Sequence, residues 1–385
     1  MTVNIAKLLR RLLQRLPLRD EIIFESLPDF SCNAYPVYLR WKERFPEFRL
    51  VWAVDDPKSA RKHRTEEVMP LNPKTLKERI RAASHLYRCR GIITTNRIVE
   101  KRRPDQIYLF LGHGSKTKTT KGFYEPGRYA DYIQVQSHFF DEITMREYGF
   151  ARDQLVYLGY PRCDWFFADA KDRRRPKAVG GEPYMIWLPT VRRRTNGKKD
   201  VEDSQYDQIG MPLVYSLGAL KRLDQHLQQK HLHLLFKPHP RQDVRGMAAQ
   251  SLRNIHVLTD QTLAEEGLQL YQAIAESSAL ITDYSSVFYD YLLLDRPIAT
   301  TTDDAESWKE TTGFAFDLET IYDRCTTRVS ALEDLMAFAD SVAAGKDALS
   351  AARRAVREKT NLYFDGHSAD RVVDFMAEKL GLEQS

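Results

Sequence analysis

Three short segments join ionisable or hydroxyl side chains to the ends of apolar strands, and their residue types suit phosphate chemistry. In the first, the apolar stretch 279–282 ends at Asp283, and the tandem serines Ser285 and Ser286 then open a predicted helix. The first N–H groups of a helix lack internal partners, and the helix dipole places partial positive charge there. Two added hydroxyl donors therefore predict a phosphate-binding turn, although a single serine would more simply cap the helix.

The second segment is the cationic loop 237–241, which reads Lys-Pro-His-Pro-Arg after an apolar strand. Two prolines restrict its backbone, so Lys237, His239 and Arg241 project from a loop of fixed shape. Such a group neutralises the charge on a diphosphate leaving group or on a phosphoryl group in transfer. The alternative interpretation is a basic surface turn.

The third segment presents a histidine at the end of the apolar strand that precedes it. His113 stands between Gly112 and Gly114, and Lys116 and Lys118 follow it. Glycines on both sides let the backbone approach a ligand closely. A histidine in this place is positioned to act as a general base, and the lysines add charge for an anionic substrate. A loop histidine without a chemical role is the alternative.

Two further strand ends carry a proline followed by an arginine. The segment 159–164 contributes Arg162 and the segment 188–192 contributes Arg192, but each by itself is better explained as a turn. The sequence contains no P-loop, no G-x-G-x-x-G, no H-E-x-x-H and no nucleophile elbow.

The elements that must position these segments alternate between strand and helix. Predicted strands cover 21–26, 48–56, 91–96, 106–111, 132–137, 184–190, 233–236, 255–260 and 279–282. Predicted helices cover 33–45, 75–83, 139–148, 213–230, 263–277, 332–344, 348–358 and 371–380. Such alternation with short connections is typical of parallel α/β sheets, which bind ligands at the carboxyl ends of their strands.

The charged stretch 169–183, rich in Gly and Pro, predicts a linker between two such sheets. We therefore expect an amphipathic helix at 1–17, an N-terminal Rossmann-like domain at 18–175 and a C-terminal Rossmann-like domain with a helical tail at 176–385. The expected fold class is α/β, a doubly wound pair facing a central cleft.

Composition excludes several classes of protein. The 385 residues are 43% hydrophobic and 29% charged, which is enough apolar surface to exclude a disordered chain. The sequence has no run of about 18 apolar residues and no secretory signal. Its four cysteines lie far apart, without a metal or redox spacing, so we expect reduced thiols in a cytoplasmic protein.

The net charge of +5 is small, but the basic residues are clustered. This favours an anionic partner, namely a phosphorylated substrate, a membrane surface or a nucleic acid. Residues 3–16 place leucines on one helical stripe and lysine or arginine on another. That pattern predicts an anchor lying in the membrane surface, or alternatively a helix packed on the protein core.

The ordered set of motifs resembles the CDP-glycerol glycerophosphotransferases of teichoic acid synthesis. The likeness rests on KPHP at 237–240 and ITDYSSVFYDYLLLDRPI at 281–298, with the HG loop, GYPRCD and LPTVR between IIFES near residue 22 and FDGHSADR near residue 367. It implies a GT-B fold with the active site in the cleft. It also implies transfer of an alditol phosphate from a CDP-alditol to a lipid-linked saccharide at the inner membrane face, with release of CMP.

Carried over to this sequence, the resemblance implies that His113 is the base. His239, Ser285 and Ser286 would contact the donor diphosphate. The remaining residues predicted to bind the donor are Lys237, Arg241, Asp283, Arg192 and Arg162. Gly112, Gly114, Lys116 and Lys118 would lie near the acceptor or its phosphate. Asp283 or Asp290 could hold Mg²⁺, but no dedicated metal cage is evident.

Several alternatives stay open from the sequence. The length is similar to that of the family's primases, so we expect a primase-like enzyme with a single catalytic unit. The family's HG loop commonly continues Thr-Pro-Leu-Lys, whereas residues 115–118 read Ser-Lys-Thr-Lys. Ribitol phosphate transfer and polymerase activity therefore remain alternatives, as does a GT-B glycosyltransferase or epimerase. We expect no nucleic-acid partner, because the aromatic residues lie mostly within apolar strands. A homo-oligomer is compatible with the sequence.

Overall fold

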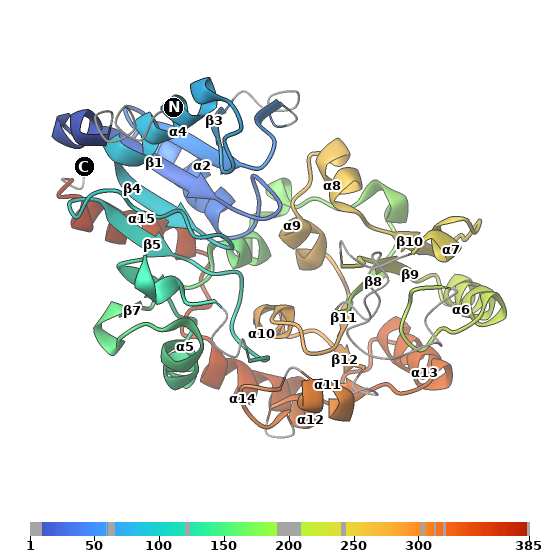
Figure 1. The fold of residues 1–385 in the computed structure, drawn as a ribbon. Helices are drawn as coiled ribbons and strands as arrows, with labels where there is room; N and C mark the ends of the chain where they lie inside the picture. The colour runs from blue at the N-terminus through green and yellow to red at the C-terminus, as the bar shows by residue number, and fades with distance from the viewer. Residues whose placement is uncertain are drawn as a thin grey trace. The chain divides into compact units, whose positions relative to one another are not determined.

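The computed structural model describes residues 10–58, 60, 66–119, 124–190, 209–239, 244–301, 305–311, 313–318 and 321–382. The chain forms two compact units (Figure 1). The first unit contains Met1–Ser115, Lys121–Phe167 and Leu362–Ser385, and the second contains Lys116–Thr120 and Ala168–Asn361. Each unit is built on a parallel sheet, which confirms the expected α/β class and is consistent with a GT-B-like fold.

The sheet of the first unit has the strand order β3-β2-β1-β4-β5-β6-β7, with every pair parallel. Its strands are β1 (Arg19–Glu25), β2 (Arg49–Val54), β3 (Glu67–Pro70), β4 (Cys89–Thr94), β5 (Ile107–Phe110), β6 (Tyr132–Gln134) and β7 (Leu155–Val156). The chain winds outward from β1 in one direction and then from β4 in the other. The switch point of this doubly wound sheet, where such folds bind ligands, therefore lies between the ends of β1 and β4.

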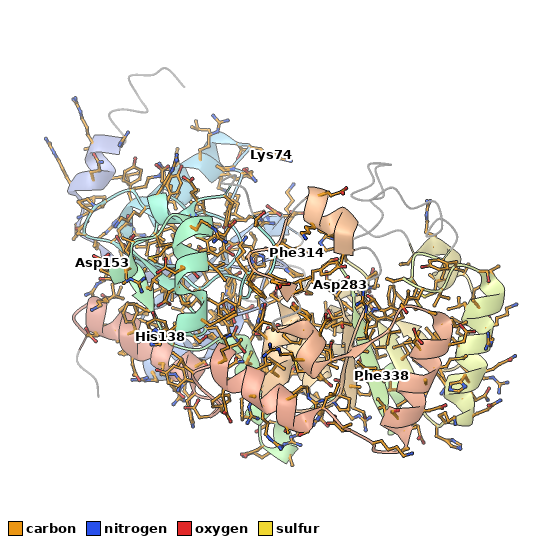
Figure 2. All side chains as sticks on the ribbon, turned by 90° about the horizontal axis from the view of Figure 1, so that it is seen from below. Lys74, His138, Asp153, Asp283, Phe314 and Phe338 are labelled. Carbon is orange, nitrogen blue, oxygen red and sulfur yellow. The ribbon has the colours of Figure 1, made fainter. Side chains whose placement is uncertain are left out.

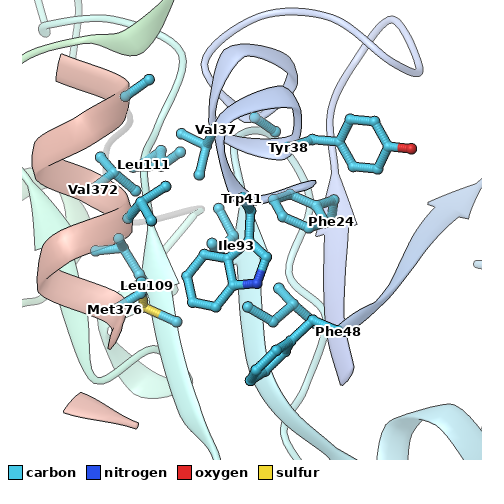
Figure 3. Packing of buried hydrophobic residues seen from close by; sticks show 14 of the residues in the cluster. Phe24, Val37, Tyr38, Trp41, Phe48, Ile93, Leu109, Leu111, Val372 and Met376 are labelled. Atoms are coloured by element: carbon cyan, nitrogen blue, oxygen red, sulfur yellow. The ribbon is translucent and has the colours of Figure 1, made fainter. Parts of the chain in front are cut away.

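The central residues of β1, β2, β4 and β5 are apolar and buried, as expected for a parallel sheet covered by helices. The helices are α2 (Ala34–Arg44), α4 (Leu76–Arg88), α5 (Asp141–Tyr148) and α15 (Ser368–Lys379). Figure 3 shows Trp41 of α2 packed among Leu109 of β5 and Val372 and Met376 of α15, all within one buried cluster. A segment from the C-terminal end of the chain thus completes the first core.

This packing changes the expected division of the chain. The helical tail was predicted to belong to the second domain, but residues 362–385 belong to the first unit. The reason is the apolar face of α15, where Val372, Val373 and Met376 are fully buried against the first sheet. Amphipathic spacing alone predicts that a helix has a buried face, but it does not predict which core receives it.

The segment 159–164, interpreted from sequence as a turn, joins α15 to the first unit. Asp164 accepts hydrogen bonds from the backbone N–H groups of Ser368 (3.0 Å) and Ala369 (2.7 Å) at the start of α15. Arg371 Nε donates to the Leu158 carbonyl at 2.9 Å. Burial raises the Asp164 pKa to about 6. Two sequence-distant motifs therefore form one structural joint.

The second sheet repeats the topology of the first, in the order β10-β9-β8-β11-β12-β13. Its parallel strands are β8 (Tyr184–Leu188), β9 (His233–Phe236), β10 (Ile255–Val257), β11 (Ala279–Thr282), β12 (Ile298–Thr300) and β13 (Thr327–Arg328). Its helices are α6 (Leu217–Gln229), α7 (Arg245–Ala248), α8 (Asp260–Glu266), α9 (Leu270–Ala275), α10 (Val287–Tyr291), α11 (Ala305–Thr311), α12 (Tyr322–Cys325), α13 (Leu332–Ala343) and α14 (Ser350–Thr360). The second switch point lies between the ends of β8 and β11.

Two helix predictions differ from the structure at glycine or turn positions. The helix predicted at 263–277 is two helices, α8 and α9, because Gly267 ends α8 in the left-handed conformation at φ +62°. The helix predicted to start at residue 213 begins at Leu217 after a serine cap, Ser216, whose hydroxyl accepts from Ala219 N–H. Both errors follow from local capping that apolar periodicity does not reveal.

The predicted N-terminal helix is described only in part. Residues 10–15 are helical, and residues 1–9 lie outside the described residues. Leu13 is buried, whereas Leu12 and Leu16 are 54% and 41% exposed. In the portion of the chain that the structure covers, no helix has both the length and the apolar character needed to cross a membrane. All four cysteines carry free thiols.

The joint at α15 gives a test of the fold. Gly159 has a φ of +78°, and an added Cβ would lie 2.4 Å from Ser368 Oγ. Gly159→Ala should therefore cost about 1–2 kcal/mol for the left-handed backbone and about 1–3 kcal/mol more for overpacking. Denaturant unfolding of the two forms measures the difference.

Gly149→Ala is the matched control in the same unit. Gly149 has a similar φ of +73°, but its added Cβ would meet Glu125 Cβ at an ordinary 3.6 Å. Equal destabilisation by the two substitutions would show that the α15 joint adds no steric constraint.

Candidate active site

His113 is held by the backbone at the carboxyl end of β5. Its neighbours Gly112 and Gly114 have φ values of +65° and +132°, which L side chains rarely adopt. Both glycines are buried, whereas His113 itself is exposed. Its Nδ1 lies 3.4 Å from the Thr95 carbonyl oxygen. A carbonyl only accepts, so a hydrogen bond here places the proton on Nδ1, which is the neutral tautomer whose basic lone pair is on Nε2.

Two buried side chains fix the carbonyl groups of this loop. Asn33 Nδ2 donates to the Gly112 carbonyl at 2.8 Å, and Arg162 Nη1 donates to the His113 carbonyl at 2.7 Å. Arg162 N–H in turn donates to Asn33 Oδ1 at 3.2 Å. Arg162, predicted to bind the donor, is thus found in the first unit beneath the His113 loop.

The turn after β4 is organised by the last residue of β1. Glu25 Oε2 accepts from the backbone N–H groups of Thr95, Asn96 and Arg97 at 3.1, 3.0 and 3.0 Å. Burial raises the Glu25 pKa, and these hydrogen bonds and the Arg97 charge oppose that rise. Sequence reasoning missed both Glu25 and Asn33. A charged residue at the end of the apolar run of β1 was the available signal for Glu25, whereas Asn33 gave none.

Lys116–Thr120, directly after Ser115, belong to the second unit. Thr117 is buried, and its hydroxyl lies 3.3 Å from the Tyr289 hydroxyl and 3.2 Å from the Tyr322 hydroxyl. The backbone N–H of Ala315 donates to the Thr117 carbonyl at 2.8 Å. Lys118 Nζ lies 5.0 Å from the centre of the Trp308 ring, within cation–π range. Lys118 is therefore held against an aromatic ring of the second unit.

Three predicted donor segments follow three neighbouring strands of the second sheet. The loop at Lys237 follows β9, Thr190 follows β8 and Asp283 follows β11, and these strands are adjacent in the order β9-β8-β11. Because the strands are parallel, their carboxyl ends meet at one edge. The sheet therefore brings these segments together at the second switch point.

Asp283 ties the two central strand ends to each other. The carboxylate is fully buried, and its Oδ2 accepts from Thr190 N–H at 2.8 Å and from the Thr190 hydroxyl at 3.0 Å. The next residue, Tyr284, packs its ring 4.9 Å from that of Phe314; Figure 2 labels Asp283 and Phe314. Asp283 therefore shapes the turn that carries the serines.

The tandem serines stand at the start of a short helix. The expected helix through Leu294 consists of α10, five residues long, and the 3-10 turn Leu292–Leu294. Ser286 occupies the N-cap position, but within the described residues its hydroxyl makes no capping hydrogen bond to α10. Capping therefore does not account for Ser286. Ser285 and Ser286 are both half-buried.

The cationic loop is described through His239. The Lys237 side chain is only 10% exposed, and its Nζ lies 2.8 Å from Asp260 Oδ1 at the start of α8. Pro238 is buried and His239 is half-buried. Arg241 and Arg192, both predicted to bind the donor, lie outside the described residues.

The residues do not form a metal site of recognisable design. Asp283 Oδ2 is engaged by Thr190, and Asp290 Oδ2 accepts from the Tyr271 hydroxyl. Among the residues that the structure covers, no group of three or more His, Cys, Asp or Glu side chains is arranged to hold a metal ion.

Comparison with known proteins identifies the family. A family model described as CDP-glycerol:poly(glycerophosphate) glycerophosphotransferase matches residues 8–378. The chain belongs to this family. The resemblance inferred from the motifs is thus confirmed, and the protein is grouped with transferases of teichoic acid synthesis.

Curated relatives in this family include polymerases and primases. The teichoic acid poly(glycerol phosphate) polymerase of Bacillus subtilis strain 168 is 26% identical over 79% of this chain and 42% of its own length. The teichoic acid ribitol-phosphate primase of Bacillus spizizenii is 24% identical over 63% of this chain and 57% of its own length. The glycerol-phosphate primase of Bacillus subtilis strain 168 is 23% identical, with 61% of each chain covered. The chain thus spans about half the length of these relatives.

Solved structures with a similar fold agree with this grouping. A structure of the wall teichoic acid polymerase TagF has a TM-score of 0.73 at 16% identity, covering 98% of this chain and 95% of that chain. A UDP-N-acetylglucosamine 2-epimerase has a TM-score of 0.54 at 13% identity, covering 96% of this chain and 98% of that chain. At these identities, the likeness bears on the fold alone.

Proposed function

We propose that the protein transfers glycerol phosphate from CDP-glycerol to a hydroxyl of a lipid-linked saccharide and releases CMP. The observation that carries the proposal is the geometry of His113. An exposed imidazole at a strand end, with Nδ1 directed at a carbonyl, favours the tautomer whose basic lone pair is on Nε2. Family membership supports the class of donor, and the saccharide acceptor is the one that the family resemblance implies.

The proposed chemistry has two parts, removal of a proton from the acceptor and neutralisation of the diphosphate charge. His113 in the first unit removes the proton from the acceptor hydroxyl as its oxygen attacks the β-phosphorus of CDP-glycerol. The P–O bond to the α-phosphate breaks and CMP leaves. Lys237, His239 and the hydroxyls of Ser285 and Ser286 in the second unit meet the diphosphate charge. Phosphoryl transfer depends mainly on such positioning and charge.

The first test measures CMP release with a synthetic short-chain disaccharide-diphospholipid acceptor. Wild-type protein should release CMP from CDP-glycerol faster than from CDP-ribitol, and should release no UDP from UDP-sugars. His113→Ala should lower kcat by about 10²–10⁴, the usual contribution of a general base. CDP-glycerol affinity, measured by calorimetry, should stay unchanged because His113 is assigned to the acceptor.

Two results would contradict this assignment. Release of UDP from a UDP-sugar would favour the glycosyltransferase or epimerase alternative. Wild-type turnover in His113→Ala would remove His113 from the mechanism. Faster reaction with CDP-ribitol would keep the reaction class and change the alditol.

The donor site is tested separately by binding. Ser285→Ala, Ser286→Ala and His239→Ala should each weaken CDP-glycerol binding, because each removes a hydrogen bond to a charged group worth about 1.5–3 kcal/mol. Calorimetry on the three variants measures the loss directly. Ser278→Ala, outside these loops, is the control. Unchanged affinity in all three variants would locate the donor elsewhere.

We further propose that the N-terminal helix binds the inner face of the membrane. Support comes from the exposed Leu12 and Leu16 side chains and from the run of basic residues around them. Apolar burial and attraction of arginines to anionic headgroups each contribute modestly. Binding should therefore be reversible and sensitive to salt.

The double substitution Leu12→Gln, Leu16→Gln should reduce co-sedimentation with vesicles that contain phosphatidylglycerol. It should also slow reaction on vesicle-borne acceptor but leave reaction on the soluble acceptor nearly intact. Leu76→Gln, Ile80→Gln is the matched control, because these α4 side chains are 54% and 45% exposed. Equal effects of the two double substitutions would refute a specific membrane role for the N-terminal helix.

A further inference from the structure

We propose that Glu25 is a positioning residue for the reaction, which it serves by fixing the backbone turn that orients His113. This inference rests on the proposed role of His113 as the base. Glu25 acts through the peptide groups of the turn after β4, and it is assigned no contact with substrate.

Hydrogen bonds through the turn after β4 link Glu25 to His113. Oε2 of Glu25 accepts three successive backbone N–H groups, from Thr95, Asn96 and Arg97, at 3.0–3.1 Å. The Thr95 carbonyl, in the same peptide group as the clamped Asn96 N–H, lies 3.4 Å from His113 Nδ1. The orientation of the Thr95 peptide therefore decides which imidazole nitrogen carries the proton.

The turn has further hydrogen bonds, but these contact other atoms of the turn than the N–H groups that Glu25 accepts. The Tyr124 hydroxyl donates to the Asn96 carbonyl at 2.6 Å, and Leu27 N–H donates to Asn96 Oδ1 at 3.1 Å. These contacts hold the carbonyl and side chain of Asn96, whereas the Asn96 N–H, which shares a planar peptide group with the Thr95 carbonyl, is directed to Glu25. Loss of the carboxylate should thus loosen the Thr95 peptide without unfolding the turn.

Burial of the Glu25 carboxylate costs free energy. Glu25 is fully buried, and burial raises its pKa. The charged groups that face it are Arg97, whose Nη1 lies 3.9 Å from Oε1, and Asp29 and Asp55, both paired with Arg97. A charge kept at such a cost, at the switch point of the first sheet, is typical of a functional position.

A second carboxylate in β1 provides the comparison. Glu21 is also fully buried, near the other end of the strand, where Oε1 lies 3.0 Å from His85 Nδ1. It shares the burial and the strand of Glu25 but has no link to the turn at Thr95. Glu21→Gln therefore controls for the general effect of neutralising a buried acid in β1.

The experiment is a double-mutant cycle on CMP release from CDP-glycerol with the soluble acceptor. Glu25→Ala should lower kcat by up to about 10²-fold, the scale of a misplaced catalytic group, with the KM for CDP-glycerol unchanged. Glu25→Gln, which keeps an acceptor oxygen, should retain more activity, and Glu21→Gln should have wild-type kcat. In the His113→Ala background, Glu25→Gln should cause no further loss, because the imidazole it positions is absent.

A direct readout follows the tautomer. In ¹⁵N-histidine-labelled protein, with the His113 signals assigned by difference from His113→Ala, wild type should show the Nδ1–H form. Glu25→Gln should shift the signals toward the Nε2–H form. This measurement needs only folded protein, so it also decides the matter if Glu25→Ala fails to fold.

The outcomes separate the two proposals. Additive loss of kcat in the His113→Ala background, or an unchanged tautomer in Glu25→Gln, would overturn the positioning role while leaving the proposed function intact. Full activity of His113→Ala by itself would overturn the proposed base and, with it, the positioning role.

Discussion

In both sheets, the backbone turns at the switch point need a buried hydrogen-bond acceptor. At the switch point of a doubly wound sheet, the two central strands end side by side and their chains leave in opposite directions. Backbone N–H groups in the turns there have no strand partner, so a buried acceptor is needed. Glu25 at the end of β1 supplies it in the first unit, and Asp283 at the end of β11 supplies it in the second.

These two carboxylates lie next to the segments proposed to do the chemistry. Glu25 fixes the turn whose carbonyl contacts His113. Asp283, which stands two residues before Ser285, accepts hydrogen bonds from Thr190. In each unit, a carboxylate is fully buried at a position where burial of an apolar residue would cost less free energy. In both sheets, a buried carboxylate thus holds a loop that leaves a strand end.

The sequence predicted much of this arrangement, and its failures have physical causes. The predicted apolar strands before His113, Lys237 and Asp283 are β5, β9 and β11, so the candidate loops follow strand ends as expected, because parallel strands end at one edge of their sheet. The assignment of α15 failed because amphipathicity does not identify the partner core. Arg162 was assigned to the donor on its residue type, whereas its described hydrogen bonds hold the His113 loop. Long-range contacts to backbone carbonyls leave no periodic signal.

The departure of residues 115–118 from the common family pattern has a structural explanation. Thr117 stands where the family commonly has leucine, and it is buried with its hydroxyl between those of Tyr289 and Tyr322. A leucine there would remove the hydroxyl that lies between those of the two buried tyrosines. The threonine and the tyrosines therefore form a matched set inside the second unit. Since Lys118 keeps the family's lysine, the changed residue serves packing, and the departure by itself is weak evidence for a different acceptor.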